Sequence, residues 1–302
     1  MFLPLFLNAV RERENLKSLF NTAKASRKVP RYARLVLNFR EHQKVLQLLA
    51  DEPFALIPRQ QPAFPFKFLH ERLLCKGLTT EERVRCLLTN YNFLRQALTE
   101  EALQTVVADS SLVVYEREGG GHRLSILLGL SNTIYLEGEM SLVLAIDGTH
   151  AFVLSFTIVP GEIVNCSAAY SILISRLQGI KGTPGAFGIA AAILGVSPLV
   201  ALFETLQGIA RAFHITHLGG VASAYQSSYA DTFKDLYIKA YDQFFLANGM
   251  SRVSGRFFQG AIPLTPPTNA GTSKPRRSRM RRRVRSAIVD SVYATLETSC
   301  RP

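Results

Sequence analysis

The sequence has few of the residues that build metal sites or disulfide frameworks. Its four cysteines form no CxxC pair, and none of its six histidines stands at ligand spacing near a pair of cysteines. The common zinc patterns are therefore excluded, and we expect no metal. The pattern is typical of free, buried thiols in a reducing compartment, at Cys75, Cys86, Cys166 and Cys300.

The start of the chain, MFLPLFLNAVRERENL, lacks the parts of a secretory signal peptide. No basic residue precedes the apolar run, Pro4 interrupts it, and no small-residue cleavage site comes before the charges of residues 11–14. We expect an amphipathic helix there, which either docks on the core or rests on a lipid surface.

Residues 183–203 lack charge altogether, over a length of 21 residues that would span a bilayer. The segment also contains Pro184, Pro198, several glycines and many alanines, so its hydrophobicity is modest for a span. We therefore expect an apolar loop that enters a buried helix.

Positive charge is concentrated in one place. The formal net charge is +12, and KPRRSRMRRRVRS at residues 274–286 holds eight Lys or Arg and no acid, which leaves +4 (12 − 8) for the rest of the chain. Apolar residues recur about every four positions from Met280 to Leu296, so the basic run begins an amphipathic helix.

Three partners are open for these cations: an anionic membrane surface, an anionic small molecule, or acids of the same chain. Nucleic acid is disfavoured because a nucleic-acid binder usually spreads its charge over a face, and no aromatic residues interleave here. The residues we expect to contact an anionic surface or ligand are Arg276, Arg277, Arg279, Arg281, Arg282, Arg283 and Arg285.

The remaining pattern predicts helices first and a sheet later. Up to about residue 105 helical spacing dominates, with Thr79 or Thr80 capping the helix that contains ERVRCLLTNYNFLRQAL. From about residue 110, short apolar runs separated by EGGG and DGTH predict three or four antiparallel strands, covered by helices.

The last part of the chain alternates helices and strands. Ser197 and Pro198 should begin a helix, ITHLGGVA should form a strand, Asn248 and Gly249 should close a second helix, and GRFFQGAIPL should form another strand. This order resembles the GNAT acyltransferase arrangement.

The resemblance implies an α/β (α+β) fold, in which a helical N-terminal region precedes a GNAT-like mixed, largely antiparallel sheet flanked by helices. We expect a helical region over residues 1–105, the α/β core over 106–265, a linker over 266–275 and a basic helix over 276–302.

In GNAT enzymes a loop after the fourth strand cradles the pyrophosphate of acyl-coenzyme A (acyl-CoA) with backbone N–H groups. The nearest match here is RLQGIKG, in which Lys181 stands where a small residue is expected. The alternative is a generic glycine turn. The implied cofactor-binding residues are Arg176, Gln178, Gly179, Lys181 and Gly182.

Two side chains are candidates for catalysis. Tyr241 lies where a GNAT enzyme often carries a tyrosine general acid, although an aromatic core stripe with Phe244 and Phe245 is the favoured alternative. Glu139 would serve as a general base if desolvated, but we expect Glu137 and Glu139 to be solvated turn residues. No base partner is visible for Ser223 or Cys166, so a nucleophile elbow is not supported.

A second resemblance covers roughly residues 30–295. ISRLQG, YDQFFLANG, GRFF and RRSRMRRRVRSAIVDS occur in the order found in the VirK/YbjX family of bacterial proteins. Members of that family are linked with virulence, antimicrobial-peptide resistance and envelope stress. The resemblance implies a cytoplasmic protein, free or peripheral on the inner membrane.

The sequence departs from the family pattern at three matched places. Asn90 replaces the His of a His-Tyr pair, residues 194–199 lack polar and basic groups, and Gln226 stands near the place of a His. Three hypotheses follow: an acyl-CoA-dependent acyltransferase, a catalytically inert relative that binds an envelope component or partner protein, and a nucleic-acid-binding regulator.

Overall fold

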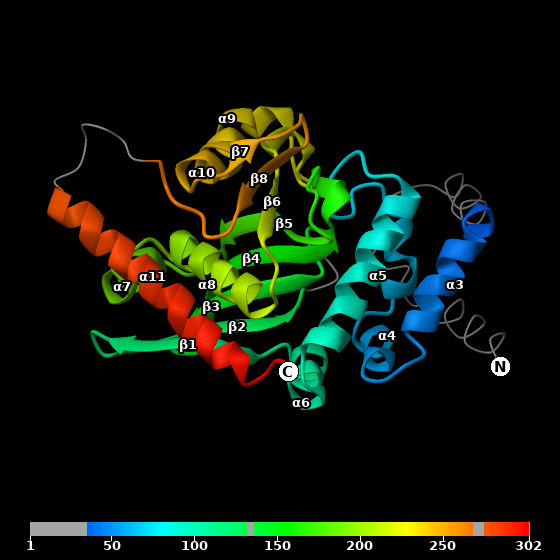
Figure 1. The fold of residues 1–302 in the computed structure, drawn as a ribbon, viewed down its shortest axis with the longest axis horizontal. Helices are drawn as coiled ribbons and strands as arrows, with labels where there is room; N and C mark the ends of the chain where they lie inside the picture. The colour runs from blue at the N-terminus through cyan, green and yellow to red at the C-terminus, as the bar shows by residue number, and fades with distance from the viewer. Residues whose placement is uncertain (1–34, 132–135, 268–274, 302) are drawn as a thin grey trace.

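An eight-stranded sheet runs through the centre of the protein (Figure 1). The structure, a computed structural model, describes residues 35–131, 136–267 and 275–301. The strand order is β1-β2-β3-β4-β5-β6-β8-β7, and every neighbouring pair is antiparallel except β5 and β6. The strands are β1 (Leu112–Gly119), β2 (His122–Leu130), β3 (Met140–Ile146), β4 (Thr149–Pro160), β5 (Tyr170–Gly179), β6 (His217–Val221), β7 (Ser251–Arg252) and β8 (Phe257–Ala261).

Most of the described helices precede the sheet, follow β5 or close the chain, and the short η6 lies between β4 and β5, so the predicted mixed α/β class is confirmed. They are α3 (Phe39–Leu48), η3 (Phe54–Leu56), α4 (Ile57–Gln60), η4 (Phe64–Leu69), α5 (Thr80–Ala97), α6 (Glu100–Gln104), η5 (Thr105–Asp109), η6 (Gly161–Val164), α7 (Ala186–Leu194), α8 (Pro198–Ala212), η7 (Ser223–Tyr225), η8 (Asp231–Phe233), α9 (Lys234–Tyr237), η9 (Ile238–Asp242), α10 (Gln243–Ala247) and α11 (Pro275–Glu297).

The meander from β1 to β4 forms where the sequence predicts it. Gly120 and Gly121 adopt φ values of 60° and 79° between β1 and β2, and Asp147 and Gly148 adopt 50° and 78° between β3 and β4. Two consecutive residues with positive φ make the turn whose twist matches paired strands. The meander then continues into a further antiparallel strand, β5.

Local capping fixes the starts of the two longest buried helices. The Thr79 hydroxyl accepts from the Glu82 N–H at 3.1 Å, while the Glu82 carboxylate accepts from the Thr79 N–H at 2.7 Å. Ser197 caps α8 by accepting from the Val200 N–H at 3.3 Å, with Pro198 as first helical residue. Both predicted N-termini are confirmed.

Helices pack on the sheet and on one another. In Figure 1, α8 and α11 cross the face of the sheet nearest the viewer. Helix α8 packs on β3, β4 and β5, α11 packs on α8 and β1, and α5 packs on β4. The contact of α8 with α11 is close because Gly208 has no side chain: a Cβ there would lie 2.8 Å from the Val289 carbonyl oxygen.

The uncharged segment 183–203 differs from the expected loop. It contains the whole of α7, a break at residues 195–197 and the first turns of α8. Among the described helices, none is both long enough and apolar enough to cross a bilayer by itself. Helices α7 and α8 reach the required length and composition only when they are taken together, and the chain bends by 52° between them.

A buried ion pair fastens the C-terminal helix to the core. The Arg285 Nε donates to the Glu204 carboxylate of α8 at 2.6 Å, and its Nη2 donates to the Asn248 side-chain oxygen at 3.0 Å. The other Glu204 oxygen accepts from Gln207 at 2.8 Å. Burial raises the pKa of Glu204, and Arg285 opposes that rise.

We expect the Arg285→Ala substitution to lower the free energy of unfolding by about 2–4 kcal/mol, because it leaves the Glu204 carboxylate buried without its cation. The pKa of Glu204 should then rise further. Because the pKa of Glu204 is higher in the folded protein than its ordinary value of 4.5, ionising this carboxyl costs more in the folded state than in the unfolded state. The free energy of unfolding therefore falls as the pH rises from 4.5 through the folded-state pKa. The defect in urea unfolding should therefore be largest at neutral pH and shrink in acid.

The matched control is Arg283→Ala on the same helix. Arg283 is exposed and makes no ion pair with a described residue, so its loss should change stability by less than about 0.5 kcal/mol. Equal losses in the two variants would contradict a specific role for the Arg285–Glu204 pair.

Candidate functional site

The two parallel strands at the centre of the sheet stay together over a short distance. β5 and β6 pair from Ile172 with Leu218 to Ile174 with Gly220, after which β5 continues alone against β4. At that point the register with β4 passes from Phe156–Ile174 to Ser155–Arg176, so Ser175 is a bulged residue. Bulges often stand beside functional sites because they redirect side chains.

Buried polar atoms gather where the strands separate. The Ser175 hydroxyl is fully buried and has no hydrogen-bond partner among the described residues. The Gln226 amide nitrogen donates to the Val221 carbonyl at the end of β6 at 2.8 Å, and the amide oxygen is likewise buried without a partner. A buried polar atom without a hydrogen-bond partner lowers the stability of the folded state. A ligand that supplied hydrogen bonds to these two atoms would remove that cost.

Tyr241 enters the separation from η9. Its side chain is 4% exposed, and its hydroxyl interacts with the backbone of Leu177 in β5. Burial raises the pKa of Tyr241, and the nearby Glu137 carboxylate raises it further. Tyr241 also stacks on Tyr237 with ring centroids 5.8 Å apart, so it takes part in an aromatic cluster as well as in the polar one.

Arg176 belongs to a strand rather than to a loop. The structure places residues 176–179 at the end of β5, and Arg176 is 6% exposed. Its Nε lies 3.5 Å from the Glu137 carboxylate, and the oxygen of the Gln178 amide, in the orientation that satisfies both groups, accepts from the same Nε at 3.1 Å. Ser228 donates to Glu137 at 2.6 Å.

Glu139 lies in a second buried cluster on the other side of Gly138. Its carboxylate is 2.8 Å from the Lys67 Nζ and accepts from the Tyr91 hydroxyl at 3.0 Å. The side chains of Lys67 and Glu139 are 3% and 1% exposed. Burial raises the pKa of Tyr91, and Glu139 adds to the rise. The expectation that Glu137 and Glu139 are solvated turn residues is therefore wrong.

Lys67 was not predicted as a site residue, although the sequence carries a signal for it. It is the lone cation in the apolar run AFPFKFLH, and a lone cation in such a run indicates a buried partner. Next to Tyr91, Asn90 accepts from the Ile158 N–H at 2.9 Å, and its amide nitrogen is buried without a partner among the described residues. Two departures from the family pattern, Asn90 and Gln226, thus each leave one orphaned amide atom.

The loop after β5 is exposed and leads directly into α7. Gln178 and Gly179 at the end of β5 and Lys181 and Gly182 in the loop are all accessible to solvent, and Gly182 and Gly185 adopt φ values of 90° and 77°. No side chain of the described residues caps α7. The Ala186 N–H makes a long contact of 3.4 Å with the Thr183 carbonyl, while the two following amides have no capping or loop-backbone acceptor among the described residues.

The predicted cationic residues divide into two groups. Arg285 pairs with Glu204 inside the fold, whereas four others are exposed and make no ion pair with a described residue. Met280, which we assigned to the apolar stripe, is 64% exposed because the packed stripe covers only the C-terminal part of α11. The side chains of Arg276 and Arg277 lie outside the described part. The exposed arginines are Arg279, Arg281, Arg282 and Arg283.

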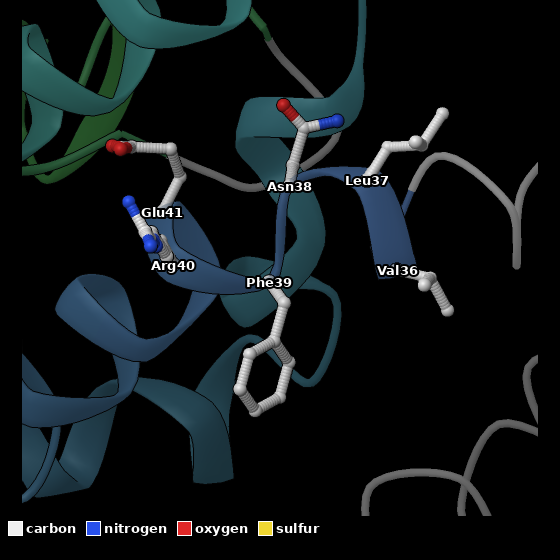
Figure 2. Close-up of a pocket in the computed structure, with 6 residues that line it drawn as sticks. All are labelled: Val36, Leu37, Asn38, Phe39, Arg40 and Glu41. Atoms are coloured by element: carbon white, nitrogen blue, oxygen red, sulfur yellow. The ribbon is translucent and has the colours of Figure 1, made fainter.

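Two hollows on the described surface lie away from this region. One, of about 410 Å³, is lined by residues 36–41, whose side chains Figure 2 shows extending from the chain in different directions. The other, of about 250 Å³, is lined by α5 residues and Tyr170. Neither includes a residue of the loop after β5. The predicted helix at residues 1–16 lies outside the described residues.

The cysteines are free thiols, as predicted. Burial raises the pKa of Cys75 to about 12 and that of Cys86 still higher, so both thiols stay protonated. Cys166 is buried as well, whereas Cys300 is only half-buried.

The fold and these buried clusters define a mixed α/β protein whose central parallel strands open at a bulge. The sequence profile described as "Protein of unknown function (DUF535)" matches residues 21–298. The chain therefore belongs to this family, which is the VirK/YbjX family. Searches of curated proteins and of solved structures found no match to the chain.

The Lys67–Glu139 pair predicts a large mutational effect. Lys67→Met should lower the free energy of unfolding by about 3–5 kcal/mol, because it leaves the Glu139 carboxylate buried without its cation. Adding Glu139→Gln to Lys67→Met should restore more than half of the loss, since no buried charge remains. Urea denaturation of the two single variants and the double variant measures the coupling.

Lys44→Met serves as the control, because Lys44 is half-exposed and its pair with Glu41 lies on the surface. That change should cost less than about 1 kcal/mol. A double variant as unstable as the sum of its single variants would show that the two residues act independently.

Proposed function

We propose that the protein is a GNAT-like acyl-CoA-binding protein of the acyltransferase type. The observation that carries the proposal is the separation of β5 from β6 at the Ser175 bulge, with buried oxygens on Ser175 and Gln226 that have no partner among the described residues. The strand order from β2 to β7 supports it, because in the GNAT arrangement the donor enters between two central parallel strands that part in this way.

The phosphates of the donor would bind at the loop after β5 and the start of α7. The amides of Phe187 and Gly188 point out of an uncapped helix start, where the helix dipole favours an anion. Lys181 lies exposed in the same loop and adds a mobile cation. Positive φ at Gly182 and Gly185 lets the backbone turn sharply enough to bring these groups together.

Within the strand separation, Tyr241 is the residue best placed to donate a proton. Transfer of an acyl group forms a bond from the acceptor amine or hydroxyl to the thioester carbon and breaks the carbon–sulfur bond. The departing sulfur takes a proton, which the Tyr241 hydroxyl would supply, and the proton that the acceptor amine or hydroxyl loses would return to the Tyr241 oxygen, so that the step balances. The acceptor in this proposal is a component of the bacterial envelope.

Binding without turnover is the alternative function, and a specific observation favours it. Burial raises the pKa of Tyr241, which makes proton transfer to a thiolate unfavourable unless the donor changes its surroundings. Glu139, the candidate base, is occupied by Lys67 and Tyr91. An inert relative would keep the donor site and lose the chemistry.

We expect saturating coenzyme A or acyl-CoA to raise the melting temperature by about 4–8 °C, since a ligand at a hundred times its Kd stabilises the folded state by about 2.7 kcal/mol. Gly179→Trp should abolish the shift by filling the mouth of the separation. Its Cβ would meet Phe152 only at 3.5 Å, an ordinary contact, so the variant should fold.

Lys181→Glu should reduce the shift, whereas Lys239→Glu, the same charge change at an exposed position of η9, should leave it intact. Release of free coenzyme A thiol from an acyl-CoA then separates the two functions: release that Tyr241→Phe removes indicates catalysis, and binding without release indicates the inert relative. No shift with any coenzyme A species would refute the donor site.

A further inference from the structure

Helix α7 is apolar on its outer surface as well as on its buried one. No charged residue occurs between Thr183 and Phe203. Yet Phe187 is 56% exposed, Ala192 is exposed, and Ile189 is half-buried. An amphipathic surface helix normally turns polar residues outward, so an uncharged, exposed face indicates contact with something apolar.

The N-terminal turns of α11 have the opposite character. At 100° per residue, the four exposed arginines are distributed around the helix, and Met280 is exposed among them. Figure 1 shows this end of α11 extending beyond the sheet. Cations close to a helix N-terminus oppose the helix dipole, and no acidic residue occurs in the first turn to offset them. The helix therefore gains stability when an anionic partner is present.

These two features adjoin in the fold. Gly195, which ends α7, lies against Val284 of α11: a Cβ atom built on Gly195 would be 3.7 Å from the Val284 side chain. Figure 1 shows α7 beside α11 on the same side of the molecule. We call this combined surface the α7/α11 face, and it consists of Phe187, Ile189, Ala192, Arg279, Met280, Arg281, Arg282 and Arg283.

We propose that the α7/α11 face docks on the surface of an anionic lipid bilayer. Apolar side chains next to flexible cations are the combination that enters the headgroup boundary, where the cations bind anionic headgroups and the apolar residues reach the acyl chains. Arginine stems extend around a helix, so cations on its flanks also reach the surface. Nucleic acid would bind the arginines but would leave the apolar face of α7 in water. A lipid surface would contact both the arginines and the apolar face.

The proposal stands apart from the acyl-donor site. Docking is measured without coenzyme A, and donor binding is measured without vesicles, so either can fail alone. If both hold, α7 would connect them, because its first turn belongs to the donor site and its outer face to the bilayer.

The first experiment is co-sedimentation of the full chain with vesicles. We expect binding to vesicles of equal parts phosphatidylglycerol and phosphatidylcholine, and at least tenfold weaker binding to pure phosphatidylcholine. Replacing the four exposed arginines with glutamine should weaken binding by at least about twenty-five-fold, since two or more face the surface and each contributes about fivefold. The control removes four exposed cations elsewhere, as Arg40→Gln, Arg59→Gln, Lys234→Gln and Lys239→Gln, and should bind within about threefold of the parent.

The second experiment uses the absence of tryptophan from the chain. Phe187→Trp places a single indole on the α7/α11 face, and its emission should shift to shorter wavelength with anionic vesicles. Leu236→Trp, at a 63% exposed position of α9, provides the matched reporter away from the face and should not shift. Circular dichroism confirms that each variant is folded.

Three outcomes would overturn the proposal. The first is equal binding to neutral and anionic vesicles, and the second is sedimentation with an unchanged Phe187→Trp spectrum. The third is binding to duplex DNA, removed by the four arginine substitutions, in a protein that ignores vesicles; that result would assign the basic helix to nucleic acid.

Discussion

The short pairing between β5 and β6 is the constraint on which the arrangement of the candidate site depends. Parallel strands need a crossover connection, and here α7 and α8 supply it before the chain returns as β6. Because pairing ends at Ile174 and Gly220, the end of β5 lacks a neighbour on that side. The Tyr241 hydroxyl interacts with the backbone of Leu177 there, and the Gln226 amide donates to the Val221 carbonyl at the end of β6, so that both side chains bring polar atoms into the interior.

Buried charge pairs then join parts of the chain that are distant in sequence. Lys67 and Glu139 connect the helical N-terminal part to the start of β3, and Glu204 and Arg285 connect α8 to α11. Such pairs contribute little net stability compared with apolar packing, but losing one partner is expensive because the other charge stays buried. The part of α11 that packs on the core begins next to Arg285, and the arginines nearer the start of the helix are exposed.

The two exposed features near α7 have different chemistry and support different proposals. An uncapped helix start beside Lys181 suits a phosphate, whereas an apolar outer face beside four arginines suits a lipid surface. Membership of the VirK/YbjX family does not decide between the two proposals, because the matching profile is described as a protein of unknown function. Under the two proposals, the acyl donor would bind at the start of α7 and the bilayer would contact the outer face of the same helix.

The sequence by itself determined the class of fold, the family, the meander and the starts of α5 and α8, because periodicity, turn residues and caps act over a few residues. Only the tertiary structure decided the state of each charge. Glu139 and Arg176 are buried and Arg279 is exposed, although nothing local distinguishes them, since burial depends on partners such as Lys67 and Glu137 that the chain brings from elsewhere. Register is equally non-local: the Ser175 bulge follows from how β4 and β5 align, and no run of neighbouring residues specifies it.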